Sequence, residues 1–201
     1  LNNFSTIKTS LQANPDKYVD LSDTIFSTYP TILNESFANC PTLVACPNFS
    51  TASGVPIYMS GTYKNCTNLK EAKIVRGTKE MYQTFRGCTS LVTVPTTISG
   101  VISYTETFMD CSSLRTAPRI IGNSSLKTLD STFRGCSSLK DAPSIPDYVT
   151  SLSWTFMDCI SLTETPPISD SVTSMVGVFY GCTSLEDIIN IPINVTNLEE
   201  T

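Results

Sequence analysis

The chain has 201 residues, a formal net charge of −5 and no histidine. The lack of histidine removes the commonest general base and the commonest metal ligand, which argues against an enzyme and against a metal centre. Its 13 basic residues form no continuous stripe, so we expect no nucleic-acid partner, which clustered Lys and Arg would hold. A hydrophobic content of 40% excludes a disordered chain, and because no run of 18 apolar residues occurs we expect no membrane insertion by this segment.

Residues 1–32 lack the repeat that fills the rest of the chain and are predicted to form an N-terminal cap. Asn3 is suited to begin a short helix in which Ile7 and Leu11 lie on one face, and the Asn-Pro-Asp sequence that follows would end it. The alternation of apolar and polar residues over 18–22 then predicts a degenerate first strand. A helix at this place would cover the first exposed turn of a repeat stack.

Residues 33–201 are built from a repeat. An aromatic residue stands three positions before a cysteine and a leucine three positions after it, in seven copies. Successive cysteines are 26, 22, 23, 25, 23 and 23 residues apart, a period typical of a solenoid whose units bury their apolar face only against their neighbours. The copies are Phe37/Cys40/Leu43, Tyr63/Cys66/Leu69, Phe85/Cys88/Leu91, Phe108/Cys111/Leu114, Phe133/Cys136/Leu139, Phe156/Cys159/Leu162 and Phe179/Cys182/Leu185.

Each copy predicts one coil made of a strand, a proline corner, a return segment and a tight turn. The leucine and the small or apolar residue three positions after it frame a short strand, which a proline ends in most copies. The residue before the cysteine is Asn, Asp or Gly in every copy, and these residue types tolerate a left-handed turn. The fold class is therefore an α/β solenoid of about seven coils of 22–26 residues, with short parallel strands and an N-terminal helical cap.

Seven of the eight cysteines occupy the same repeat position. Equivalent positions on neighbouring coils lie roughly 5 Å apart and point the same way, so we expect a buried ladder of free thiols. Cys46 lies outside this column, and a disulfide between Cys40 and Cys46 is an open alternative. A linear ladder does not converge on one point as tetrahedral metal ligands must, so we expect no metal and no cofactor.

A second period of 48 residues lies on top of the first. TFRGCTSL at residue 84 recurs as TFRGCSSL at 132, and TFMDCSSL at 107 recurs as TFMDCISL at 155. This pattern indicates that units of two coils were duplicated. The repeat then continues to residue 201 in mid-coil, where Val195 and Leu198 fall at the next apolar positions.

The pattern F-x-x-C-x-x-L-x-x-A/V-P, preceded by a large apolar residue and a threonine, resembles the BspA-like class of leucine-rich repeats. The resemblance covers residues 33–201, with departures at Lys73 and Ile189, which replace the proline, and at Tyr63, which replaces the phenylalanine. It implies a leucine-rich-repeat solenoid in a surface-exposed or secreted protein. Members of this class are often implicated in adhesion to host proteins or to other cells.

Two surfaces are candidates for binding. The fourth and fifth positions after each cysteine should face outward, and we interpret them as a solvated face whose charge changes from mildly positive to acidic along the chain. On the other side, Trp, Tyr, Met and Arg, which are enriched at interfaces, occupy columns beside the inward phenylalanine, where lateral packing is the alternative to binding. The candidate binding residues are Tyr82, Arg86, Met109, Arg134, Trp154, Met157 and Tyr180.

We therefore predict a non-catalytic recognition or adhesion module that works outside the cell or at its surface. Its expected partner is a protein or a glycan on another cell or in the surrounding matrix. The alternative is a structural building block that self-associates through solenoid ends, at Val195 and Leu198, into a surface fibre or layer.

Overall fold

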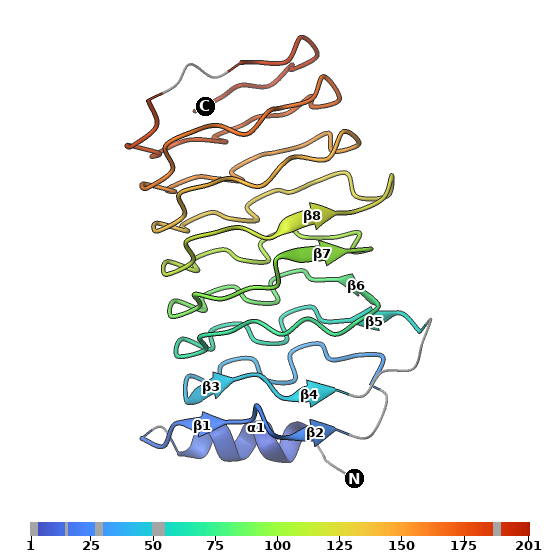
Figure 1. Ribbon diagram of the computed structural model, residues 1–201, viewed down its shortest axis with the longest axis vertical. Coiled ribbons are helices and arrows are strands. Elements are labelled where there is room, and N and C mark those ends of the chain that lie inside the picture. The colour runs from blue at the N-terminus through green and yellow to red at the C-terminus, as the bar shows by residue number, and fades with distance from the viewer. Residues whose placement is uncertain (1–3, 15, 27–29, 50–54, 187–189) are drawn as a thin grey trace.

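A computed structural model describes residues 4–14, 16–26, 30–49, 55–186 and 190–201. Asn3, which was predicted to begin the helix, lies outside the described residues, as does Ile189. Figure 1 shows the described chain winding upward as a stack of flattened coils, with one helix behind the lowest strands. Each coil places one segment in front and one behind, and the stack therefore has two layers.

The described residues contain one helix and eight short strands, which form four parallel two-stranded sheets. The helix α1 spans Phe4–Ala13, over the position that Ile7 and Leu11 predicted. The strand pairs are β1 (Val19–Asp20) with β3 (Leu43–Ala45), β2 (Ile25–Phe26) with β4 (Asn48–Phe49), β5 (Ile57–Tyr58) with β6 (Thr78–Glu80), and β7 (Thr97–Ser99) with β8 (Arg119–Ile121).

The seven residues before each repeat cysteine form what we call the turn layer, and the residues from that cysteine to the proline form the strand layer. Backbone amides of one turn bond to carbonyls of the next turn. Phe85 N donates to Thr107 O at 2.9 Å and Gly87 N donates to Met109 O at 2.8 Å, and the same bonds recur along the stack. The residue before the cysteine has a positive φ, between 58° and 76°, in all seven copies, which confirms the left-handed turn that its residue types predicted.

The strand layer is less regular than predicted. Of the described segments that directly follow a repeat cysteine, only β3 is a regular strand, and later coils are joined there by single bridges such as Glu71 with Thr93 and Thr116 with Asp141. A tight turn precedes these residues and a proline follows in most copies, so one residue is left to pair. Regular strands instead occur beyond the proline corner, where the sequence predicted a plain return segment.

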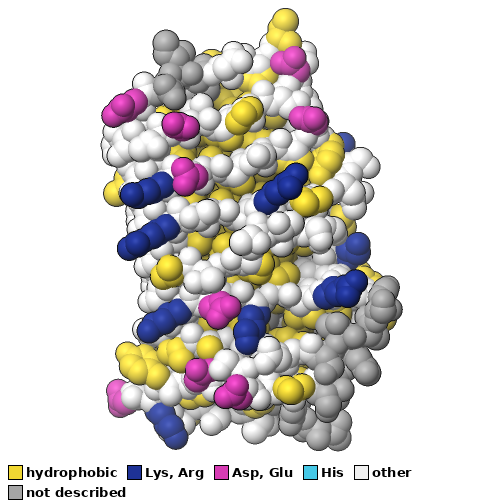
Figure 2. Space-filling model, viewed as in Figure 1, with side chains coloured by type: hydrophobic (Ala, Val, Ile, Leu, Met, Phe, Trp, Pro, Cys, Tyr) yellow, Lys and Arg dark blue, Asp and Glu magenta, His cyan; other side chains and the backbone are white. Residues whose placement is uncertain are grey.

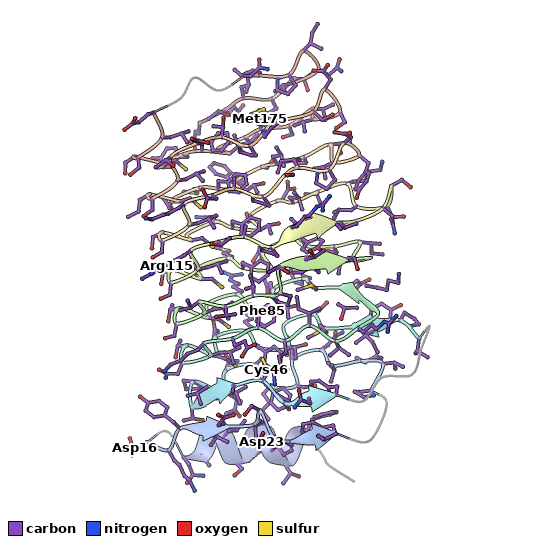
Figure 3. The ribbon with its side chains drawn as sticks, viewed as in Figure 1. Asp16, Asp23, Cys46, Phe85, Arg115 and Met175 are labelled. Carbon is purple, nitrogen blue, oxygen red and sulfur yellow. The ribbon has the colours of Figure 1, made fainter. Side chains whose placement is uncertain are left out.

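An aromatic ladder runs through the core between the two layers. The rings of the repeat aromatics, from Phe37 through Tyr63 to Phe179, stack with centroids 5.5–5.7 Å apart and interplanar angles of 2–10°. This ring spacing measures the rise of one coil. Figure 3 shows Phe85 and Met175 inside the stack and Arg115 projecting from its edge. Offset stacking adds about 0.5–1.5 kcal/mol per pair beyond the burial of apolar area.

The cysteine ladder is present as predicted. All eight cysteines are free, and among those at the repeat position only Cys182 is not fully buried. From Cys66 onward each thiol donates to the carbonyl oxygen of the aromatic residue one coil earlier, at 3.0–3.1 Å. Cys40 and Cys46 form no disulfide, and the Cys46 thiol donates instead to Glu71 O.

Helix α1 occupies the turn layer below the first complete turn. Leu11 is buried and its carbonyl accepts a hydrogen bond from Thr42 Oγ1 at 2.9 Å, while Gln12 Nε2 donates to Ala38 O at 3.2 Å. Because β1 and β2 pair with β3 and β4, the strand part of segment 1–32 already belongs to the ladder. The role of α1 as a stabilising cap remains a prediction.

Candidate recognition surface

The turn layer contains a second left-handed column that carries Trp154. The residue five positions before the cysteine has a positive φ, between 53° and 63°, in all seven copies. The sequence pattern did not predict this column, because only two of its members are glycines. Its residues are Glu35, Gly61, Gln83, Glu106, Ser131, Trp154 and Gly177.

Trp154 lies over the next coil. A Cβ atom added to Gly177 would stand 2.1 Å from Trp154 Cζ3 and 2.2 Å from Cε3, so the indole ring covers the space that a larger residue at 177 would fill. The side chain of Trp154 is half-buried, and its backbone amide donates to Val176 O at 2.7 Å. The ring thus contributes to lateral packing and still presents part of its surface to solvent.

The seven candidate residues form a band along the outer side of the turn layer, which we call the turn face. Five of them lie two positions before successive cysteines, so each is one coil from the next. Tyr82 and Tyr180 are 43% and 50% exposed, and the other five are half-buried. The band runs in order through Tyr82, Arg86, Met109, Arg134, Trp154, Met157 and Tyr180.

The lower end of the band is a polar network, and two of its members were missed by sequence reasoning. Arg86 Nη1 lies 2.5 Å from Glu106 Oε2, which is the one ion pair among the described residues. Gln83 donates both to Glu106 Oε2 and to the Tyr82 hydroxyl. The sequence contains a pattern that could have predicted this network, because Gln83 and Glu106 occupy equivalent positions on neighbouring coils.

The upper end of the band is apolar. Trp154 and Met157 lie on one coil and Tyr180 lies on the next, joined by the bond from Asp158 N to Tyr180 O at 2.7 Å. Met157 N also donates to Trp154 O at 3.3 Å, so the three residues are neighbours along the chain or across one coil, and we call them the Trp154 patch. Tyr82 and Arg86 lie several coils away from this patch.

The outward positions of the strand layer form a second surface, the strand face. The fourth and fifth residues after the cysteine are exposed, as predicted, except that Val44 and Ala45 are half-buried and residue 187 lies outside the described residues. Figure 2 shows basic and acidic side chains interspersed on this face. Hollows of about 630 and 410 Å³ are lined by these outward positions, and a third, of about 430 Å³, includes Glu71 and Thr93 and extends beyond the proline corner. The alternation of residue types did not predict them.

The described ranges hold neither of two classes of site, a metal centre or a membrane-spanning helix. They contain no group of three or more Cys, Asp or Glu side chains placed to hold a metal ion. None of their helices is long and apolar enough to span a membrane.

The repeat geometry agrees with comparisons to known proteins. The family model for the BspA-type leucine-rich repeat region, which holds six copies, matches residues 18–115 and 104–201. The chain is similar to the crystal structure of the T. pallidum leucine-rich repeat protein at 24% identity and a TM-score of 0.56, over 80% of this chain and 72% of that one. At this identity the likeness shows the fold alone, and no curated protein matches the chain. Because the family model spans nearly all of its length, the chain belongs to the BspA-type leucine-rich repeat family.

Proposed function

We propose that the chain is a non-catalytic recognition module, displayed at the cell surface or secreted, that binds a protein partner through the Trp154 patch. Membership of the BspA-type family favours a surface repeat module that takes part in protein interactions. The observation that carries the proposal is the position of Trp154, a bulky side chain in a left-handed turn with part of its ring exposed.

The backbone at Trp154 is costly for this residue type. A φ of 59° is strained for a bulky side chain by about 1–2 kcal/mol, whereas glycine takes this conformation freely. Equivalent coils use Gly, Ser, Gln or Glu at the same place, so the turn itself does not require an indole. Strained residues cluster at binding sites, where the packing of the surrounding structure holds them in place.

The neighbours of Trp154 suit a protein partner. Trp, Tyr and Arg dominate the energetics of protein interfaces, and methionine adapts to irregular surfaces. Met157 lies on the same turn as Trp154, Tyr180 lies on the next coil, and Arg134 lies one coil below Met157. An apolar centre with a polar rim is the usual arrangement of a protein interface.

The experiment is a binding screen of the purified chain against immobilised extracellular-matrix proteins, with two matched variants. Trp154→Gln introduces a residue that the same turn accepts at Gln83, and it should weaken a detected interaction by at least about tenfold. Ile160→Gln removes an exposed apolar residue of the strand layer and should leave binding unchanged. Equal binding of the parent and Trp154→Gln would overturn the proposal.

Self-association through the solenoid ends is the second candidate, and it predicts different behaviour in solution. Leu198 is 40% exposed and Val195 is half-buried, so apolar side chains are available for such contacts. Sedimentation velocity over a hundredfold concentration range separates the two candidates. A constant monomer favours the recognition module, whereas growth that Leu198→Glu abolishes favours assembly.

A further inference from the structure

We propose that the strand face binds a linear acidic glycan through its two hollows, which are the same repeat site built twice. This inference goes beyond the proposed function, because it uses the other face of the stack and another class of ligand. Its support is the chemistry that lines the two hollows and the spacing between them.

The larger hollow, of about 630 Å³, lies beside β1 and β3. An ammonium, two carboxylates, a carboxamide and a phenol line it. Tyr18 is 66% exposed, so its ring offers an apolar platform with a polar tip. These polar groups belong to Tyr18, Asp20, Asn68, Lys70 and Glu71.

The second hollow, of about 410 Å³, lies further up the same face. It is lined by two cations, one carboxylate and three hydroxyls, with no large apolar side chain. Figure 3 shows Arg115, one of the cations, projecting from the edge of the stack. The lining residues are Arg115, Thr116, Ser138, Lys140, Asp141 and Ser161.

The two hollows occupy equivalent repeat positions. Lys70 and Lys140 each lie four residues after a repeat cysteine, and an acidic residue, Glu71 or Asp141, follows each of them. A small polar residue, Asn68 or Ser138, lies two residues before each lysine. The cysteines concerned are three coils apart, so the hollows are separated by three ring spacings of 5.5–5.7 Å.

The cations of both hollows are available to a ligand. The one ion pair among the described residues joins Arg86 to Glu106 on the turn face, so no carboxylate lies at ion-pair distance from Lys70, Arg115 or Lys140. Arg115 and Lys140 lie on adjacent coils, where Lys140 N donates to Arg115 O at 3.2 Å. Two cations one coil apart can hold a carboxylate or a sulfate ester through charge-assisted hydrogen bonds.

The acidic side chains in the hollows limit which anionic ligands can bind there. Asp20, Glu71 and Asp141 can only accept hydrogen bonds, so the hydroxyls of a sugar can donate to them, whereas the phosphodiesters of a nucleic-acid backbone have no proton to donate. The hydroxyls of Ser138 and Ser161 can both donate and accept. The larger hollow holds one cation and two carboxylates, and the second holds two cations and one carboxylate, so a ligand with few anionic groups among many hydroxyls matches them better than a nucleic acid does. The second hollow also lacks the apolar anchor that a protein partner would need.

Because the site is repeated, the affinity should depend on the length of the glycan. A chain that spans both hollows gains effective concentration at the second site, whereas a short fragment occupies the hollows independently. Arg115 lies between Lys70 and Lys140 in the same column and continues the positive charge along the path. No Lys or Arg follows Lys140, so the path ends at the second hollow.

The test is a calorimetric titration of the chain with four probes: polygalacturonate, dextran sulfate, neutral dextran and single-stranded DNA. Either acidic glycan, but not neutral dextran, should bind, and the one that binds better shows whether carboxylates or sulfate esters are preferred. A short galacturonate oligomer should bind at two per chain, more weakly than the polymer by about tenfold or more.

Three variants complete the test. Lys70→Gln and the double variant Arg115→Gln/Lys140→Gln should each reduce the number of oligomers bound per chain from two to one. Each should also weaken the binding of the polymer by about tenfold. The control Lys64→Gln/Lys127→Gln removes two positive charges, as the double variant does, but at positions outside the hollows. It should not alter glycan binding. Equal loss in this control, equal affinity for DNA, or no binding of either acidic glycan would overturn the glycan site and leave the Trp154 patch untouched.

Discussion

The carboxylate of Asp110 lies against the backbone of Gly135 on the next coil. A Cβ atom at Gly135 would stand 2.6 Å from Asp110 Oδ1, and Asp158 stands in the same relation to Gly181 at 2.4 Å. A side chain in this orientation leaves no room for a Cβ atom on the coil above it, and Asn65 approaches Gly87 in the same way. This packing gives a physical reason for the period of two coils, since an Asp coil and a Gly coil fit together as a pair.

Gly135→Ala should lower the free energy of unfolding by about 2 kcal/mol, because it adds strain at a φ of 73° and a clash with Asp110. Asp110→Gly removes the clashing side chain, so the double variant should be more stable than the sum of the two single effects predicts. Urea denaturation followed by circular dichroism measures all three. Strict additivity would show that the two residues are not coupled.

Gly177→Ala should displace the indole ring of Trp154 toward solvent. Trp154 is the single tryptophan of the chain, so its fluorescence reports on this contact alone. We expect emission at longer wavelength and stronger quenching by acrylamide. Gly61→Ala is the matched control, because it changes the same turn position far from the indole, beside Glu35. Unchanged emission in Gly177→Ala would contradict the packing of Trp154 over Gly177.

Val178→Thr should stabilise the chain by about 0.5–1 kcal/mol. Threonine fills this column in most coils and its hydroxyl donates to a carbonyl one coil earlier, as Thr107 Oγ1 does to Met81 O at 2.7 Å. Val178 lacks this donor, and threonine has nearly the same shape. The reverse change, Thr107→Val, should cost about 1–2 kcal/mol. Thermal denaturation of both variants tests the pair, and a destabilised Val178→Thr would contradict the role of the column.

Stability should fall at alkaline pH because cysteine thiols are buried, both in the ladder and at Cys46 outside it. Burial raises the pKa of Cys46 from 9.0 to about 12 and that of Cys182 to about 11. Unfolded thiols ionise near pH 9 while the buried thiols stay protonated, so stability is unaffected below pH 9 and is lost as the pH rises above it. A fully buried thiol such as Cys46 contributes a slope of up to about 1.4 kcal/mol per pH unit, and the partly exposed Cys182 contributes less because solvent screens it.

Urea midpoints measured from pH 7 to pH 10.5 check this prediction. Cys182→Ala should make the urea midpoint fall less steeply with pH above pH 9. Near pH 7 the midpoint of the variant should depend on pH as that of the parent does. A midpoint that stays constant between pH 8 and pH 10.5 would mean that the thiols are not held protonated by the fold.

The sequence was sufficient to predict the ladder architecture. The aromatic, cysteine and leucine columns gave the buried stack, and Asn, Asp or Gly before each cysteine gave the left-handed turn, because each column holds one chemical type. The second left-handed column was missed because it mixes Glu, Gln, Ser and Trp with only two glycines, Gly61 and Gly177. Tertiary packing enforces that conformation on residues which do not favour it.

The surface was harder to predict than the core. The packing of Trp154 on Gly177 joins two coils, and a column of residue types does not show which side chain covers which neighbour. The hollows on the strand face depend in the same way on side-chain size in adjacent coils. Alternation correctly placed Lys70 and Lys140 outside, but it could not show that each lines a depression.

The measurement that tests recognition through Trp154 most directly is fluorine NMR of the chain labelled with 5-fluorotryptophan. The labelled chain carries one fluorine, at Trp154, and unlabelled matrix proteins add no signal. We predict that a protein which binds the chain shifts or broadens this single resonance, and that Ile160→Gln behaves as the parent does. A panel in which no protein binds, or a bound protein that leaves the resonance unchanged, would contradict recognition through Trp154.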